Sequence, residues 1–239
     1  NTVPAPDSGP VVAALLERIA RDARVRVFAI GAVTRGREGK SLANLSEAAE
    51  AGCVAFSDDG SPVADGQLMR NALALLGALG LPLSEHSDDP VLNAGGVMNE
   101  GRVSERLGLP GQPAAAEVTA IARNLALAEA TGGRLHVAHI TTARGLELVA
   151  DAKARGLNVT CEVTPSHLFL TEDAVFGAGP EPAYDTNAKI NPPLRTEADR
   201  LALVRGINEG IIDAIATDHA PHAREDKLCE FDHAAPGIA

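Results

Sequence analysis

The chain alternates short, almost continuous apolar runs with longer stretches that have helical periodicity. Short apolar runs next to turn residues predict strands that are buried on both faces. The predicted strands are 25–30, 53–56, 81–85, 135–140, 157–163 and 211–217. The predicted helices are 46–51, 65–79, 114–131, 143–155 and 196–209. Ser46 is the expected N-cap of the first of these helices, and Gly80, Gly156 and Gly210 each follow a helix as stop signals.

Alternation of strands and helices at this spacing predicts βαβ units and a parallel sheet. Two architectures fit, a closed (β/α)8 TIM-type barrel and an open doubly wound sheet. A GxGxxG turn after a strand would favour the open sheet, and the sequence contains none. About six βα units are present, which is fewer than a barrel of eight needs. Because no linker interrupts residues 1–239, we expect a single barrel domain that is incomplete in this chain, and a start at Asn1 without Met is typical of a fragment.

Composition narrows the class of protein. The chain is 45% hydrophobic but 3% aromatic, so the core is expected to be aliphatic. A net charge of −11 argues against a nucleic-acid partner, which needs a basic surface. No apolar run approaches the roughly 18 residues of a membrane span, and no secretory signal is visible. Three widely spaced cysteines predict reduced thiols in a cytoplasmic protein.

Histidine or aspartate follows every predicted strand from the second onward. In parallel α/β folds the carboxyl ends of the strands carry the chemistry. All seven histidines except His233 lie in these segments. The segments are Ser57-Asp58-Asp59-Gly60, Glu85-His86-Ser87-Asp88-Asp89, His136-Val137-Ala138-His139, Glu162-Val163-Thr164-Pro165-Ser166-His167 and Thr217-Asp218-His219-Ala220-Pro221-His222.

Each segment by itself has an ordinary structural interpretation. An Asp-Asp-Gly sequence is a common turn, and a single histidine at a strand end is usually a hydrogen-bonded core or rim residue. His136 and His139 stand three apart, so at most one of them faces a barrel interior. The convergence of five strand ends on one rim favours a metal site. Oxygen and imidazole ligands suit Zn²⁺, or Mn²⁺ or Co²⁺.

Such a site would support hydrolysis. Water on a metal has a pKa of roughly 7. A neighbouring carboxylate must then take the proton and pass it to the leaving group. Asp218, at the end of the last predicted strand, is suited to that task.

Several motifs together resemble those of one family. TDHAPH at 217–222, INPPLR at 190–195, FSDDG at 56–60, EHSDD at 85–89 and VAHITT at 137–142 occur in the order found in dihydroorotases. Dihydroorotases are zinc-dependent cyclic amidohydrolases with a (β/α)8 barrel. The resemblance extends over essentially the whole chain, and NPPLR followed by TDHAPH is its most specific part.

The resemblance implies roles for individual residues. Asp59 corresponds to the carboxylate that bridges two zinc ions, and His86 and His139 to the ligands of the second zinc. Asp218 corresponds to a ligand of the first zinc and to the catalytic acid/base. The implied substrate contacts are Asn1, Asn191, His222, and the main chain at Pro236 and Gly237. The family's His-x-His-x-Arg strand, which supplies the remaining ligands of the first zinc, is absent here and is expected upstream of Asn1, and most of the C-terminal segment is absent too.

Three further functions are compatible with these residues. Hydantoinases (dihydropyrimidinases) and allantoinases are related cyclic amidases, but they bridge their metals with a carboxylated lysine, where this chain has Asp58 and Asp59. Besides these cyclic amidases, the second alternative is a non-catalytic homologue that scaffolds aspartate transcarbamoylase. The third alternative is an open-sheet binding module without metal. A small-molecule substrate is expected, with a homodimer or transcarbamoylase association as further expectations. His136 and His233 are interpreted as structural or surface residues, and His167 as either a residue that supports the metal ligands from behind or a structural residue.

Overall fold

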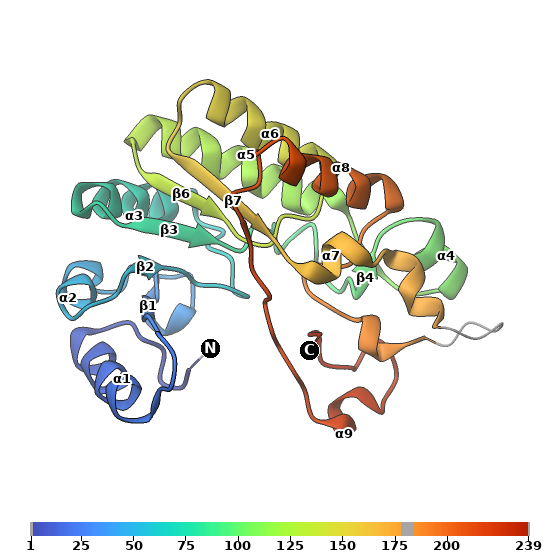
Figure 1. Cartoon of the computed structure of the whole chain (residues 1–239), viewed down its shortest axis with the longest axis horizontal. Helices are drawn as coiled ribbons and strands as arrows, with labels where there is room; N and C mark the ends of the chain where they lie inside the picture. The colour runs from blue at the N-terminus through green and yellow to red at the C-terminus, as the bar shows by residue number, and fades with distance from the viewer. Residues whose placement is uncertain (1, 178–183, 239) are drawn as a thin grey trace. The chain divides into compact units, whose positions relative to one another are not determined.

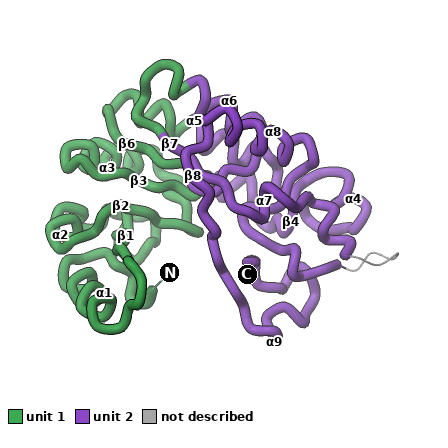
Figure 2. The backbone as a smooth tube through the Cα atoms, in the orientation of Figure 1, with its two compact units in different colours: residues 1–86, 123–137, 152–159 green, residues 87–122, 138–151, 160–239 purple. Residues whose placement is uncertain are grey.

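The computed structural model describes residues 2–177 and 184–238. These residues form two compact units, shown in Figure 2. Unit 1 comprises residues 1–86, 123–137 and 152–159, and unit 2 comprises residues 87–122, 138–151 and 160–239. Each unit therefore draws on several separate stretches of the sequence.

The fold is α/β, built on parallel strands (Figure 1). The strands follow one another in the order β1-β2-β3-β6-β7-β8. Their bounds are Ile30–Gly31, Ala55–Phe56, Pro82–Glu85, Arg134–Val137, Val159–Val163 and Ala214–Ile215. A separate parallel pair consists of β4 (Met98–Asn99) and β5 (Gly111–Gln112). The prediction of a parallel α/β fold is confirmed.

The helices follow the strands as the alternating pattern predicts. In unit 1, helix α3 lies beside β3 and β6. Several segments, among them α1, α4, α7 and the short 3-10 turns at 35–37, 172–176 and 186–188, had no counterpart in the prediction. The helices are α1 (Gly9–Asp22), α2 (Leu45–Glu50), α3 (Gly66–Leu79), α4 (Arg102–Leu107), α5 (Ala114–Thr131), α6 (Ala143–Ala154), α7 (Pro165–Phe169), α8 (Glu197–Asn208) and α9 (Arg224–Lys227). Among the described residues, none of these helices is both long and apolar enough to cross a membrane.

Helix boundaries largely agree with the cap signals. The Asp65 carboxylate accepts the amides of Gln67 and Leu68 at the start of α3, and Gly80 ends that helix with φ 71°. Ser46 was the wrong cap for α2, because the helix starts one residue earlier. Asn44 caps it instead, and its side chain accepts from the amide of Glu47.

The predicted strands at the two ends of the sheet are too long. Residues 25–30 contribute only Ile30 to β1, and residues 211–217 contribute only Ala214 and Ile215 to β8. Apolarity signals burial, but a strand needs a hydrogen-bonded neighbour. Among the described residues, β1 pairs with β2 alone and β8 with β7 alone. Phe28 accordingly lies 65% exposed.

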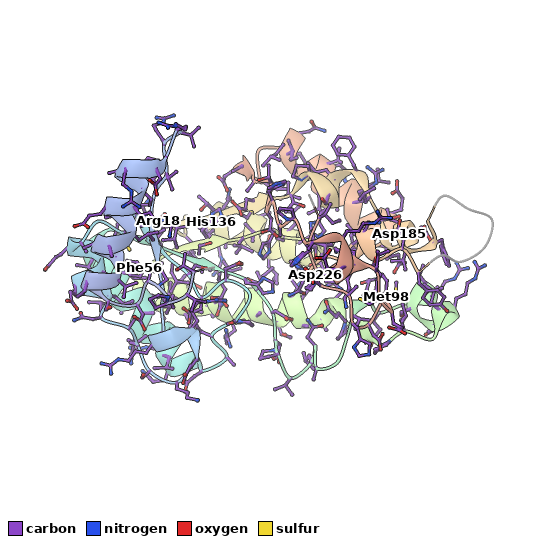
Figure 3. All side chains as sticks on the ribbon, turned by 90° about the horizontal axis from the view of Figure 1, so that it is seen from below. Arg18, Phe56, Met98, His136, Asp185 and Asp226 are labelled. Atoms are coloured by element: carbon purple, nitrogen blue, oxygen red, sulfur yellow. The ribbon has the colours of Figure 1, made fainter. Side chains whose placement is uncertain are left out.

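Each unit has its own buried apolar residues, marked in Figure 3 by Phe56 for unit 1 and Met98 for unit 2. Fully buried side chains of unit 1 include Phe56, Leu73, Leu76, Leu83 and Leu135. The cluster in unit 2 consists of Met98, Val103, Leu107, Val175, Ala188, Ile190, Leu194 and Phe231. Both sets are predominantly aliphatic, as the composition predicts.

A close backbone approach joins α3 to the turn before β6. A Cβ added to Gly133 would stand 2.8 Å from the carbonyl oxygen of Leu73. Because this neighbour is backbone, we expect Gly133→Ala to lower the free energy of unfolding by about 1–3 kcal/mol. Denaturant titration measures the change. Gly66→Ala is the matched control, since a Cβ on Gly66 meets nothing within 4 Å. Equal stability of the two variants would contradict this packing argument.

Candidate metal centre

Three neighbouring strands bring their carboxyl ends to one edge of the sheet. Strand β2 pairs with β3 through Phe56 and Leu83, and β3 pairs with β6 through Glu85 and Val137. The segments that follow these strands therefore begin close together. Asp59 is the third residue after β2, His86 the first after β3 and His139 the second after β6.

Asp59, His86 and His139 form a candidate metal-ligand triad. One ligand atom from each side chain lies within 4.8 Å of the other two. His86 Nδ1 lies 3.6 Å from Asp59 Oδ1. Both histidines are buried, at 4% and 5% exposure, whereas the Asp59 side chain is 47% exposed. Two imidazoles and a carboxylate fit a borderline divalent cation such as Zn²⁺.

Backbone strain accompanies two of the predicted ligands. His139 has φ 31° and Asp218 has φ 45°, and they belong to four non-glycine residues with positive φ in the described ranges. Such conformations cost about 1–3 kcal/mol each and persist where surrounding contacts hold them. The His139 backbone is therefore held in place by its neighbours.

The two adjacent carboxylates of the Asp-Asp-Gly turn have different environments. Asp58 is 3% exposed, and its oxygens accept the amide of Val33 at 2.8 Å together with the amide and hydroxyl of Thr34. Burial raises the pKa of Asp58, and the hydrogen bonds from Thr34 and Val33 oppose that rise. Asp58 thus fastens the 33–34 loop, and Asp59 belongs to the triad.

Glu85 is a buried carboxyl group that the sequence pattern did not single out. It is 2% exposed at the end of β3, and burial raises its pKa to about 8. Within that shift the charge of Arg123 acts against the rise in pKa, and the charges of Asp58 and Asp59 act with it. Glu85 is therefore mostly protonated at neutral pH, immediately before His86. An acidic residue at the end of an apolar run was the available signal.

Asp218 lies in unit 2, on the exposed loop after β8, and is not a member of the triad. Strand β8 ends at Ile215, and Asp218 has a left-handed backbone. His219 and His222 are both exposed.

The predicted substrate contacts in unit 2 gather through backbone hydrogen bonds. His222 Nε2 lies 3.1 Å from the carbonyl oxygen of Pro236. The amide of Gly237 donates to the carbonyl of Lys189 at 2.9 Å, two residues before Asn191. A Cβ on Gly237 would stand 2.5 Å from the carbonyl oxygen of Ala220. Asn1 lies outside the described residues.

Lys227 joins these segments, although its sequence context gave no signal of that role. Its ammonium donates to the carbonyls of Ala235 at 2.7 Å, Gly237 at 2.8 Å and Thr186 at 3.1 Å. Burial lowers the pKa of Lys227, and the charge of Lys189 lowers it further. The main chain around Pro236 and the segment before Asn191 are thereby fastened to one cation.

His167 occupies a structural position. Its Nε2 lies 3.0 Å from the carbonyl oxygen of Pro192, and its Nδ1 lies 2.7 Å from the hydroxyl of Thr164. A carbonyl only accepts, so Nε2 carries the proton and Nδ1 accepts from Thr164. Burial lowers the pKa of His167 to about 4. His136 is half-buried, and His233 is exposed beside Asp232.

Comparison with solved structures defines the class of fold. The chain is similar to an L-hydantoinase (dihydropyrimidinase) from Arthrobacter aurescens, with a TM-score of 0.81 and 22% identity, covering 99% of this chain and 53% of that one. It is also similar to a D-hydantoinase (dihydropyrimidinase) from Thermus sp., with a TM-score of 0.62 and 25% identity, covering 73% and 39%. This is the hydantoinase-type barrel fold, so the predicted barrel class is confirmed.

Sequence comparison assigns the family. Residues 1–145 match the family described as "Dihydro-orotase-like". The whole chain is 49% identical to proteins named dihydroorotase from Pelotomaculum thermopropionicum and from Geobacter sp. strain M21. The matches cover 54% and 55% of those proteins, so the chain spans about half the length of the relatives. The chain belongs to the dihydroorotase-like family.

The buried Asp58 and the half-exposed Asp59 are neighbours in sequence, so the same substitution at each position tests their different roles. We expect Asp58→Asn to lower the free energy of unfolding of the metal-free protein by about 1–3 kcal/mol, because an amide cannot accept every bond that the carboxylate accepts. We expect Asp59→Asn to leave that free energy within about 0.5 kcal/mol, since its side chain is half exposed, and to weaken divalent-metal binding. Denaturant titration and metal titration measure the two effects. A reversed order of stabilities would refute the assignment.

The environment of His167 predicts a pH dependence of stability. Between about pH 6.5 and pH 4 the unfolded state binds a proton that the folded state does not, so stability falls as pH falls. The whole shift corresponds to about 3 kcal/mol. We expect His167→Gln to lose this component of the pH profile. Unfolding titrations from pH 4 to 7 with a chelator present check it, with exposed His233→Gln as control. Parallel profiles for wild type and His167→Gln would disprove it.

Proposed function

We propose that the full-length protein containing this chain is a zinc-dependent dihydroorotase. It would interconvert N-carbamoyl-L-aspartate and dihydroorotate in pyrimidine synthesis. The supporting observation is 49% identity to dihydroorotases across the whole chain. The Asp59–His86–His139 triad supports the metal requirement of this proposal.

In this proposal Asp59, His86 and His139 hold the cation. A bound divalent cation supplies Lewis acidity and lowers the pKa of water to roughly 7. The Asp218 carboxylate takes the proton of the attacking water and delivers it to the ring nitrogen that departs. Its exposed position on the loop after β8 leaves the carboxylate accessible to solvent and to a substrate.

The remaining proposed residues orient the substrate. Asn191 and His222 offer polar side chains to the carboxylate and ring of dihydroorotate. The main chain at Pro236 and Gly237 contacts the ring. The hydrogen bonds around Lys227 support this assignment, because they keep the 235–237 main chain in one conformation.

A related cyclic amidase is the second proposal. Its support is the likeness to hydantoinase structures at 22–25% identity. Those enzymes bridge their metals with a carboxylated lysine, as the resemblance implies, and the strand end here carries Asp58 and Asp59. Dihydroorotase is therefore the better proposal. An intact triad also argues against a non-catalytic scaffold. Association with aspartate transcarbamoylase and a homodimer stay predictions.

The decisive experiment assays the full-length protein against dihydroorotate, hydantoin and allantoin. We expect hydrolysis of dihydroorotate alone, lost on chelation and restored by Zn²⁺. We expect Asp218→Ala to lower kcat by about 10²–10⁴-fold, because the proton-transfer group is removed. Its thermal unfolding should match wild type, and exposed His219→Ala is the neighbouring control. Near-normal turnover by Asp218→Ala would sink the mechanism, and a preference for hydantoin or allantoin would sink the substrate assignment.

A further inference from the structure

Glu117 on helix α5 is a buried carboxylate that accepts four hydrogen bonds from one loop. It is 3% exposed. Its oxygens accept the amides of Thr141 at 3.1 Å and Thr142 at 2.9 Å. They also accept both hydroxyls, that of Thr142 at 2.7 Å. Hydrogen bonds to an ionised carboxylate are about twice as strong as neutral ones. Four such bonds fix the loop against α5.

The fixed loop begins directly after a proposed metal ligand. Only Ile140 separates His139 from Thr141. With φ 31°, the His139 backbone is strained and relies on its surroundings to stay in place. The Thr141 and Thr142 amides are the nearest downstream points at which the main chain is tied to a buried charge.

Arg195 is a second buried charged residue that contacts the same loop, and it also binds Asn99. Its Nε donates to the Thr141 hydroxyl at 3.1 Å, and its Nη1 donates to Asn99 Oδ1 at 2.8 Å. Arg195 is 5% exposed; burial lowers its pKa, and the negative charge of Glu117 opposes that shift. The Thr141 hydroxyl thus lies between an acidic and a basic buried group.

The start of helix α6 packs closely against this cluster at Gly145. A Cβ on Gly145 would stand 2.7 Å from the Thr142 hydroxyl and 3.1 Å from Glu117 Oε1. The glycine lets the first turn of α6 approach the carboxylate closely. The cluster is therefore a packed polar unit, in which a small change in Glu117 is transmitted to the loop.

We propose that Glu117 is a positioning residue for His139, and that it sets the affinity of the triad for its divalent cation. This inference rests on the proposed function. Glu117 would act through the main chain of 141–142, without touching the metal or the substrate. Outer residues that orient ligands typically contribute 10–100-fold to metal affinity.

The test compares Glu117→Gln with Glu129→Gln in the full-length protein. Glu129 lies on the same helix but is exposed and pairs with Arg155 at 2.8 Å. We expect Glu117→Gln to raise the Kd for Zn²⁺, measured by chelator competition, by about 10–100-fold. We expect Glu129→Gln to leave it unchanged. The visible spectrum of the Co²⁺-loaded protein should change in Glu117→Gln only.

Thr141→Val provides a second, milder variant. It removes the hydroxyl that joins Glu117 to Arg195 and keeps the amide that donates to Glu117. We expect a smaller rise in Kd, about 3–10-fold, in the same direction. Unfolding titrations of the metal-free variants confirm that each is folded at the assay temperature. If Glu117→Gln does not fold, the Kd and the Co²⁺ spectrum of Thr141→Val are compared with those of wild type instead.

The outcomes separate the two proposals. Wild-type Kd and Co²⁺ spectrum in folded Glu117→Gln or Thr141→Val overturn the positioning role and leave the proposed function standing. Absence of divalent-metal binding by the wild-type protein overturns the metal-dependent function and the positioning role together. Weaker binding in both variants, with the control unchanged, supports the inference.

Discussion

The in-register parallel pairing of β2, β3 and β6 is the constraint on which the rest of the site depends. A parallel ladder brings the carboxyl ends of neighbouring strands to one edge, whatever their separation in sequence. Phe56 pairs with Leu83 and Glu85 with Val137, so the segments carrying Asp59, His86 and His139 leave the sheet together. A slip of one residue would turn each strand's side chains to the other face. The buried apolar side chains of these strands fix that register, namely Phe56 in β2, Leu83 in β3 and Leu135 in β6.

Buried carboxylates fasten the loops next to the ligands. Asp58 accepts two amides and a hydroxyl from residues 33–34, and Glu117 accepts two amides and two hydroxyls from residues 141–142. In both cases the donors are consecutive residues that include a threonine hydroxyl. Taking a carboxylate out of water is costly unless donors of this kind surround it. Asp58 and Glu117 therefore each hold a loop in place. Asp59 of the triad is the neighbour of Asp58, and His139 of the triad lies just before the loop that Glu117 binds.

In unit 2, positively charged lysine side chains hold irregular main-chain segments together. Lys227 places its ammonium among backbone carbonyls from Thr186, Ala235 and Gly237. Lys189 likewise donates to the carbonyls of Phe231 and Asp232. Main-chain segments without regular secondary structure have few bonds of their own, so these two side chains supply the missing donors. Of the proposed substrate contacts, Asn191 and Gly237 lie on segments joined in this way, and His222 is linked to Pro236 by its own hydrogen bond.

The sequence by itself determined the class of fold, most of the long helices and three residues that the structure brings together as a candidate metal site. Residues 114–131 were predicted with their observed bounds, and Gly80 was identified as the end of α3, because periodicity and cap chemistry are local properties. Helix α1 was missed, although Ser8 before it and the proline in its first turn are helix-start signals. Only the tertiary structure decided the lengths of β1 and β8, the distinct environments of Asp58 and Asp59, and the bonds of Glu117, Lys227 and His167. Most of these depend on burial or on partners 24 or more residues away, which leave no local pattern in the chain. Lys227 also bonds Ala235 and Gly237, which are 8 and 10 residues away.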